Sequence, residues 1–127
     1  MDKYILEEPY KKSIYYADSP FRYPGGKFYA LKFILPFLHS VPHDEYREPF
    51  VGGGSVFFGK NKAEINWIND LESDLIKTYI VIKDFEKKDN LIERVCKEIA
   101  TKERHKEIKS YIPISIEDIA YKTYYLN

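Results

Sequence analysis

The sequence predicts an α/β fold, and three observations support this prediction. Residues 46–58 read as a short strand, a run of three glycines and an apolar helix start. Residues 63–68 form a second short run with apolar members, followed by Asn69 and Asp70. Apolar residues also recur at helical spacing before the first run and after the second. Helix and strand patterns that alternate in this way favour a sheet with helical connections.

Composition limits the class of protein. A chain of 127 residues suits one domain. Hydrophobic residues make up 44% and charged residues 31%, which is typical of a soluble globular protein. Twenty basic residues balance twenty acidic ones. Duplex-binding domains usually show a basic excess, so composition alone does not indicate nucleic-acid binding, although a local basic face stays open.

Cysteine and histidine usage gives no sign of a disulfide or a metal site. Cys96 is the single cysteine, and the three histidines, at positions 39, 43 and 105, form no tight cluster. A reducing, cytoplasmic location is therefore expected. We expect no membrane association, because no run approaches the roughly 18 apolar residues of a spanning helix and the N-terminus lacks a signal-peptide core.

The chain before the first strand divides into an arm, a loop and a helix. Residues 1–19 are tyrosine-rich and charged without a sustained period, and we expect an N-terminal arm. Residues 20–27 have loop chemistry, with Pro24 followed by two glycines. A helix is predicted from Lys27, and Pro36 is expected to end or kink it. Lys27 is either a solvated residue before a core helix or a ligand-binding cation.

The first strand is predicted over residues 46–51. Pro49 lies inside it and needs an edge position or the strand's exit. Glu48 is the acidic residue at that exit, either as a solvated edge residue or as part of a site. The second strand is predicted over residues 63–68.

The glycines at 52–54 predict a turn that approaches a ligand closely. Glycine tolerates positive φ and has no Cβ, and a strand, a glycine turn and a helix start together place backbone N–H groups around a ligand. A plain tight turn is the alternative. The dinucleotide fingerprint fails because Phe57 stands where a small residue belongs. The phosphate-loop pattern fails because Asn61 follows Lys60 where a hydroxyl is needed.

Asp70 follows Glu48 by 22 positions. Dinucleotide sites place a carboxylate about 20 residues along the chain to bind ribose hydroxyls. We therefore expect Asp70 to bind a ribose; the alternative is that it N-caps the next helix.

The C-terminal half predicts helices and assigns no chemistry to them. The expected core stripe of the first helix consists of Leu71, Leu75, Ile76, Tyr79 and Ile82. Residues 86–89 predict a polar break, followed by a helix from about Leu91. Basic residues at 102–109 alternate with glutamates, which favours a solvated face over the alternative of a phosphate-binding patch. Ser115 and Asp118 resemble a capping arrangement before a last helix.

Three motifs, in this order, and the last four residues of the chain resemble the Dam-type (class alpha, D12-class) S-adenosylmethionine-dependent DNA adenine-N6 methyltransferases. Residues 20–27, Pro-Phe-Arg-Tyr-Pro-Gly-Gly-Lys, resemble the family's N-terminal cofactor motif. Residues 48–55, Glu-Pro-Phe-Val-Gly-Gly-Gly-Ser, resemble its cofactor loop. Residues 69–79, beginning Asn-Asp-Leu, resemble its second-strand motif, and residues 124–127 resemble the helix before its target-recognition region.

The resemblance implies a Rossmann-like S-adenosylmethionine-dependent methyltransferase core with added helices, present here as an incomplete, N-terminal part. It implies that Tyr23 stacks on the adenine ring, Lys27 meets the methionine carboxylate, and Glu48 lies beside the methionine amino group. The implied cofactor-binding residues are Tyr23, Lys27, Glu48, Phe50, Val51, Gly52, Gly53, Gly54, Ser55 and Asp70.

The family's catalytic motif is missing from the sequence. Adenine-N6 methylation uses a D-P-P-Y type motif to hold the exocyclic amine of a flipped base, and no such motif occurs here. No catalytic residue is assigned. We expect residues 20–127 to be the cofactor-binding half of a methyltransferase domain, without the target-recognition region, from a truncated or split enzyme.

The expected function is site-specific transfer of a methyl group to adenine N6 in duplex DNA by the complete enzyme, in restriction-modification or a related role. The alternative is a non-catalytic cofactor-binding or assembly module that needs a partner chain. Two strands do not make a parallel sheet buried on both faces. We therefore expect a second chain or another copy to cover the sheet's exposed flank.

Overall fold

The computed structural model describes residues 17–127, and the chain divides into two compact units, Met1–Asn69 and Asp70–Asn127. Each unit is described by itself. The expected arm at 1–19 falls mostly outside the described residues.

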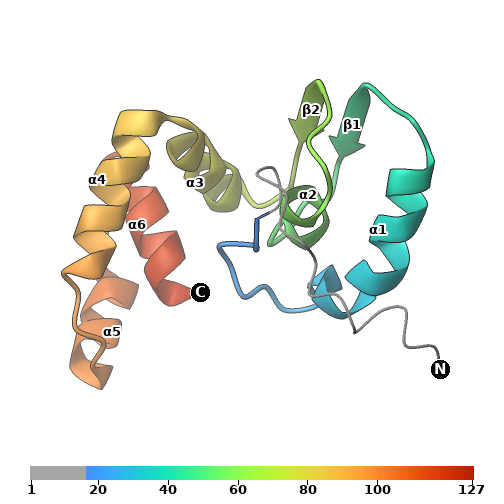
Figure 1. Ribbon diagram of the computed structural model, residues 1–127. Helices are drawn as coiled ribbons and strands as arrows, with labels where there is room; N and C mark the ends of the chain where they lie inside the picture. The colour runs from blue at the N-terminus through green and yellow to red at the C-terminus, as the bar shows by residue number, and fades with distance from the viewer. Residues whose placement is uncertain (1–16) are drawn as a thin grey trace. The chain divides into compact units, whose positions relative to one another are not determined.

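The first unit is a small α/β arrangement. It contains the 3-10 helix η2 (Lys27–Ala30), helices α1 (Leu31–Ser40) and α2 (Ser55–Gly59), and strands β1 (Glu45–Glu48) and β2 (Ile65–Ile68). The two strands pair in parallel, with Glu45 opposite Ile65 and Glu48 opposite Ile68 (Figure 1). A mixed α/β class is therefore confirmed, with both strands shorter than the sequence predicted.

The core of this unit lies between the helices and one face of the sheet. Leu31 and Leu35 of α1 pack with Val56 of α2, and Tyr46 of β1 packs against this cluster. Side chains alternate between the faces of a strand. On β2, Ile65 and Trp67 are 55% and 47% exposed. One face of the sheet therefore leaves large apolar side chains open to solvent.

Helix α1 does not end at Pro36, as one of the expected outcomes had it, but continues to Ser40. Proline removes one helical hydrogen bond. Pro36 lies on the exposed side of α1, while Leu35 is buried on the other side. Packing of the apolar face of α1 therefore outweighs the local effect of the proline.

The second unit is helical throughout its described residues. It consists of α3 (Ser73–Lys83), α4 (Phe85–Cys96), α5 (Lys102–Ser110) and α6 (Ile116–Leu126). Helix α6 contacts the other three helices. The buried core contains Val81, Leu91, Ile108, Ala120 and Tyr121, at least one from each helix.

Two details of this unit differ from the expected pattern. Helix α4 begins at Phe85, so the expected polar break at 86–89 is wrong. The side chain of Asp84 accepts a hydrogen bond of 3.0 Å from the backbone N–H of Lys87 and starts the helix there. Leu71, expected in the core stripe, precedes α3 and is 96% exposed, whereas Leu75 and Tyr79 are buried.

The cap at Ser115 is confirmed. Its hydroxyl accepts a hydrogen bond of 3.0 Å from the backbone N–H of Asp118, and α6 begins one residue after Ser115.

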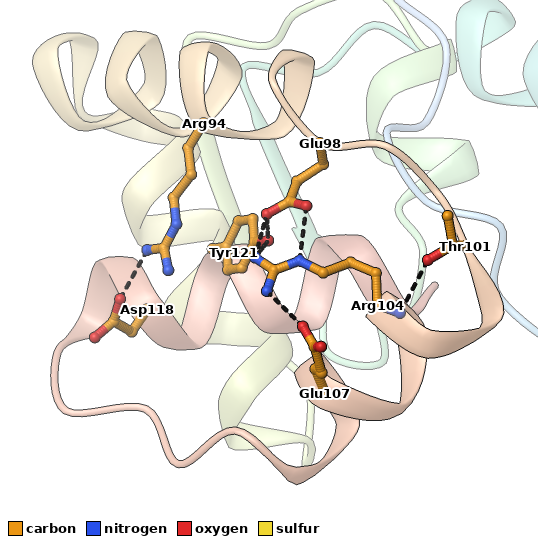
Figure 2. Close-up of polar contacts among 7 residues, drawn as sticks. All are labelled: Arg94, Glu98, Thr101, Arg104, Glu107, Asp118 and Tyr121. Carbon is orange, nitrogen blue, oxygen red and sulfur yellow. Dashed lines mark hydrogen bonds and ion pairs between the residues drawn. The ribbon is translucent and has the colours of Figure 1, made fainter.

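A polar network links α4, α5 and α6 (Figure 2). Arg104 donates to both carboxylate oxygens of Glu98, at 2.6 and 2.9 Å, and the hydroxyl of Tyr121 donates to the same carboxylate. Arg94 pairs with Asp118 at 2.7 Å and lies over the Tyr121 ring. The Arg104 side chain is 41% exposed, and Lys102, Lys106 and Lys109 are exposed, so the solvated basic face expected here is confirmed, with Arg104 paired to Glu98 at its edge.

Within residues 17–127, no helix is long and apolar enough to cross a membrane. The same residues contain no group of three or more His, Cys, Asp or Glu side chains placed to hold a metal ion.

Candidate cofactor-binding site

The glycine turn after β1 adopts the conformation that its sequence requires. Gly52 and Gly54 have φ angles of 50° and 75°, which residues with a Cβ rarely adopt. The backbone N–H of Gly54 donates to the carbonyl of Val51 at 2.8 Å. The carbonyl of Gly54 accepts from Phe58 at 2.8 Å, so Gly54 starts α2. The turn therefore joins β1 to a helix of only five residues.

Tyr23 packs directly on this turn. A Cβ added to Gly53 would come within 2.7 Å of the Tyr23 Cβ, and one added to Gly52 within 3.3 Å of its ring. The hydroxyl of Ser19 donates to the carbonyl of Gly53, and the N–H of Gly26 donates to the carbonyl of Tyr23 at 2.9 Å. Two of the three stretches singled out in the sequence, at 20–27 and 48–55, therefore lie together.

Glu48 is a buried carboxylate, which excludes the solvated edge position considered for it. Its exposed fraction is 8%. The Tyr46 hydroxyl donates to Oε2 at 2.9 Å, and the Lys27 ammonium lies 4.0 Å from Oε1. Burial raises the pKa of Glu48, and the Tyr46 hydrogen bond and the charges of Lys27 and Lys60 oppose that rise. A hydrogen bond from the backbone of Phe57 also opposes the rise in the pKa of Glu48.

A cavity of about 320 Å³ lies beside Glu48. Its remaining lining is largely apolar, from η2, α1, α2 and β1 with the loop after it, and it consists of Lys27, Ile34, Leu38, Tyr46, Arg47, Pro49, Phe50 and Val56. Phe50 is 76% exposed, whereas Val51 behind it is buried. Ser55 is half-buried in the first turn of α2.

The sequence analysis missed two residues of this site, Tyr46 and Lys60. Lys60 is only 2% exposed, and its ammonium lies 4.4 Å from the centre of the Tyr46 ring. It donates to the carbonyl of Asn61 at 2.7 Å and to the Asn66 side chain at 3.1 Å. Alternation along β1 predicts that Tyr46 shares a face with Glu48, but nothing local in the sequence indicates a buried lysine.

Asp70 is the first residue of the second unit. Its carboxylate accepts a hydrogen bond of 3.0 Å from the backbone N–H of Glu72. Helix α3 begins at Ser73 with Glu72 as its N-cap, so the alternative that Asp70 is the N-cap is wrong. Asp70 closes a local turn after β2 and is half-buried.

Comparison with known proteins matches most of this chain to one family. Residues 23–122 match the family of D12 class N6 adenine-specific DNA methyltransferases. A stretch of 73 residues is 38% identical to the DNA N-6-adenine-methyltransferase of Escherichia phage P1. That stretch covers 58% of this chain and only 9% of the phage protein. On the family match, this chain belongs to the D12 class N6 adenine-specific DNA methyltransferases.

Proposed function

We propose that this chain is the S-adenosylmethionine-binding, N-terminal part of a DNA adenine-N6 methyltransferase. The observation that supports this most is the packing of Tyr23 on the glycine turn next to buried Glu48, inside the region matched by the family. Family membership implies dependence on S-adenosylmethionine and a DNA substrate.

The charged groups beside the cavity fit the methionine end of this cofactor. An α-ammonium group suits the Glu48 carboxylate, and an α-carboxylate suits the Lys27 ammonium. These two side chains are 4.0 Å apart, at the limit of an ion pair, and the Lys27 side chain is 49% exposed. Each can therefore exchange its weak partner for a ligand charge. When bound, the cofactor supplies an activated methyl group on a sulfonium ion.

The other residues of the site shape and close it. The turn at 52–54 offers a backbone without Cβ atoms, Val51 anchors it, and Phe50 and Ser55 lie on either side of it. Tyr23 supplies an aromatic surface for the adenine ring. Asp70 supplies a carboxylate for the ribose hydroxyls, the role of acidic residues after the second strand in nucleotide-binding α/β folds.

Residues 20–127 then form the cofactor-binding half of a Rossmann-like methyltransferase domain. In the complete enzyme, the amine nitrogen of a flipped adenine in duplex DNA attacks the methyl group directly, and the protein contributes orientation and desolvation. A restriction-modification role in the cytoplasm is part of this proposal.

A second candidate is a non-catalytic cofactor-binding or assembly module that needs a partner chain. It is favoured by the lack of a D-P-P-Y motif in the sequence and by the exposure of Ile65 and Trp67 on the sheet. In that case a second chain or another copy covers the bare face of β1 and β2.

Titration calorimetry with S-adenosylmethionine and with its homocysteine product tests the proposal. We expect both to bind the wild-type chain, NAD not to bind, and Asp70→Ala to bind about tenfold more weakly, because a hydrogen bond to a charged group contributes about 1.5 kcal/mol or more. Equal binding by Asp70→Ala would remove the ribose role. No binding by the wild type would remove the cofactor site itself.

An assay of methyl transfer from labelled cofactor to adenine-containing duplex DNA distinguishes both candidates from an enzyme that is active alone. We expect no methyl transfer by this chain alone. Transfer in the absence of other protein would show that the catalytic groups are present and that both versions of the proposal are wrong.

A further inference from the structure

We infer that Tyr46 and Lys60 are positioning residues that hold one oxygen of the Glu48 carboxylate and leave Oε1 for a cationic group of the ligand. The inference rests on the proposed cofactor role of Glu48. It adds a specific atom for the ligand and two residues that no sequence motif assigns.

The geometry of β1 separates the two oxygens of Glu48. Tyr46 and Glu48 are two residues apart on the strand, so their side chains share a face. The Tyr46 hydroxyl donates to Oε2 at 2.9 Å. The ammonium of Lys27 is nearest to Oε1, at 4.0 Å, and belongs to a half-exposed side chain. The backbone of Phe57 also bonds to the carboxylate. Among the side chains that meet Glu48, Lys27 beside Oε1 is therefore the one that a ligand cation can displace most easily.

Lys60 contacts the ring of Tyr46, whose hydroxyl bonds to Glu48. Its ammonium lies 4.4 Å from the ring centre and is held by Asn61 and Asn66. Since Lys60 is 2% exposed, its charge is not available to a ligand. A cation is attracted to the face of an aromatic ring, and more strongly when it is desolvated as here. Lys60 thus acts on the ligand only through Tyr46 and Glu48.

The same contacts favour the ionised form of Glu48. Burial raises its pKa, and the opposing groups are the Tyr46 hydroxyl, the charges of Lys27 and Lys60, and the backbone of Phe57. A ligand ammonium needs the carboxylate form. Removal of the Tyr46 hydroxyl or of the Lys60 charge raises the pKa of Glu48 further. As the pH is lowered, Glu48 then becomes protonated at a higher pH than in the wild type, and the affinity for the cofactor begins to fall at that higher pH.

Two variants test this chain of contacts. Tyr46→Phe removes the hydroxyl and keeps the ring, and Lys60→Met removes the charge and keeps the length. Tyr29→Phe is the matched control, since Tyr29 is 86% exposed. Circular dichroism establishes that each variant is folded, and if one variant is not, the other decides. Carbon NMR titration of the Glu48 carboxyl and calorimetry with S-adenosylmethionine across pH are then measured.

We expect the Glu48 carboxyl to titrate about one pH unit higher in both variants, and the acid limb of cofactor affinity to move with it. At the acidic pH values where Glu48 is protonated, the variants should bind the cofactor about tenfold more weakly than the wild type. At pH values well above that range the difference should be smaller. The Tyr29→Phe profile should superimpose on the wild type.

The NMR titration and the calorimetry can each contradict the inference independently. An unchanged Glu48 titration in the folded variants overturns the inference whether or not the cofactor binds. A shifted titration with an unmoved affinity profile also overturns it, because Oε1 would then not meet the ligand. Absence of cofactor binding by the wild type overturns the proposed function and the ligand part of the inference, while the NMR titration still decides whether Tyr46 and Lys60 control Glu48.

Discussion

The hydroxyl of Tyr46 donates a hydrogen bond of 2.9 Å to Oε2 of Glu48, two residues further along β1. Strand geometry therefore brings this hydroxyl to the buried carboxylate, and Lys27, Lys60 and the backbone of Phe57 also interact with it. A carboxylate with 8% exposure is costly to bury without partners. Its position beside a cavity, with the half-exposed Lys27 ammonium 4.0 Å from Oε1, suits ligand binding better than stability.

Glu48→Gln should weaken S-adenosylmethionine binding about 10- to 100-fold, because a hydrogen bond to a charged group contributes about 1.5–3 kcal/mol. The amide keeps the size of the side chain and loses its charge. Calorimetry at neutral pH measures the change. Glu45→Gln, on the same strand but 44% exposed, is the control and should bind like the wild type. Equal affinity of Glu48→Gln and wild type would exclude Glu48 as the partner of the cofactor's ammonium group.

Gly53→Ala should displace Tyr23 from the turn and weaken cofactor binding. The added Cβ would lie 2.7 Å from the Tyr23 Cβ, a distance that real contacts do not show. Gly25→Ala is the informative comparison, because that position has a φ of 74° and nothing within 4 Å of the added atom. It should cost about 1–2 kcal/mol of stability through backbone strain and leave affinity unchanged in the folded fraction.

Calorimetry and thermal unfolding of both glycine variants distinguish these effects. Normal cofactor binding by folded Gly53→Ala would mean that the contact between Tyr23 and the turn is not part of the site.

Local patterns predicted the strands, the glycine turn and most helices because these depend on neighbours in sequence. Alternation of side chains along the first strand predicts that Glu48 shares a face with Tyr46. The Ser115 cap follows from the spacing of three residues between Ser115 and Asp118. The helix through Pro36 was not predictable in this way, because buried Leu31 and Leu35 stabilise it through packing against α2. Tertiary contacts thus override a local signal.

The residues of the site that belong to a continuous sequence motif were predicted. Those that join the site only because tertiary contacts bury them were missed. Residues 48–55 are read directly from the sequence. Lys60 is buried only because Asn66, six residues away, and the Tyr46 ring surround its ammonium. The sequence gives a lysine no sign of such partners, since most lysines are exposed.

Ser115→Ala should destabilise the first turn of α6 by about 1 kcal/mol, the typical cost of losing an N-cap. The N–H of Asp118 loses its 3.0 Å hydrogen bond. Hydrogen exchange at Asp118 and urea unfolding measure the loss. Ser110→Ala is the control: that hydroxyl lies at the exposed end of α5, and we expect a change within about 0.5 kcal/mol. Equal effects at the two serines would contradict a capping role.

Glu98→Gln should destabilise the helical unit at neutral pH and much less in acid. Hydrogen bonds from Arg104 first, and then from Tyr121, lower the pKa of Glu98 to about 2. A carboxylate with a depressed pKa stabilises the fold fully above its unfolded value of about 4.3 and loses that effect as pH falls toward its folded value. The difference in stability between wild type and variant should therefore be constant above about pH 5 and shrink between about pH 4.3 and 2.

Urea unfolding at a series of pH values measures this difference. Glu93→Gln is the control, because Glu93 pairs with Lys97 only through side chains that are 65% and 73% exposed. Its effect should be small at every pH, as for other exposed ion pairs. Curves for wild type and Glu98→Gln that stay parallel down to about pH 2 would show that the contacts of Arg104 and Tyr121 with Glu98 do not stabilise the ionised form.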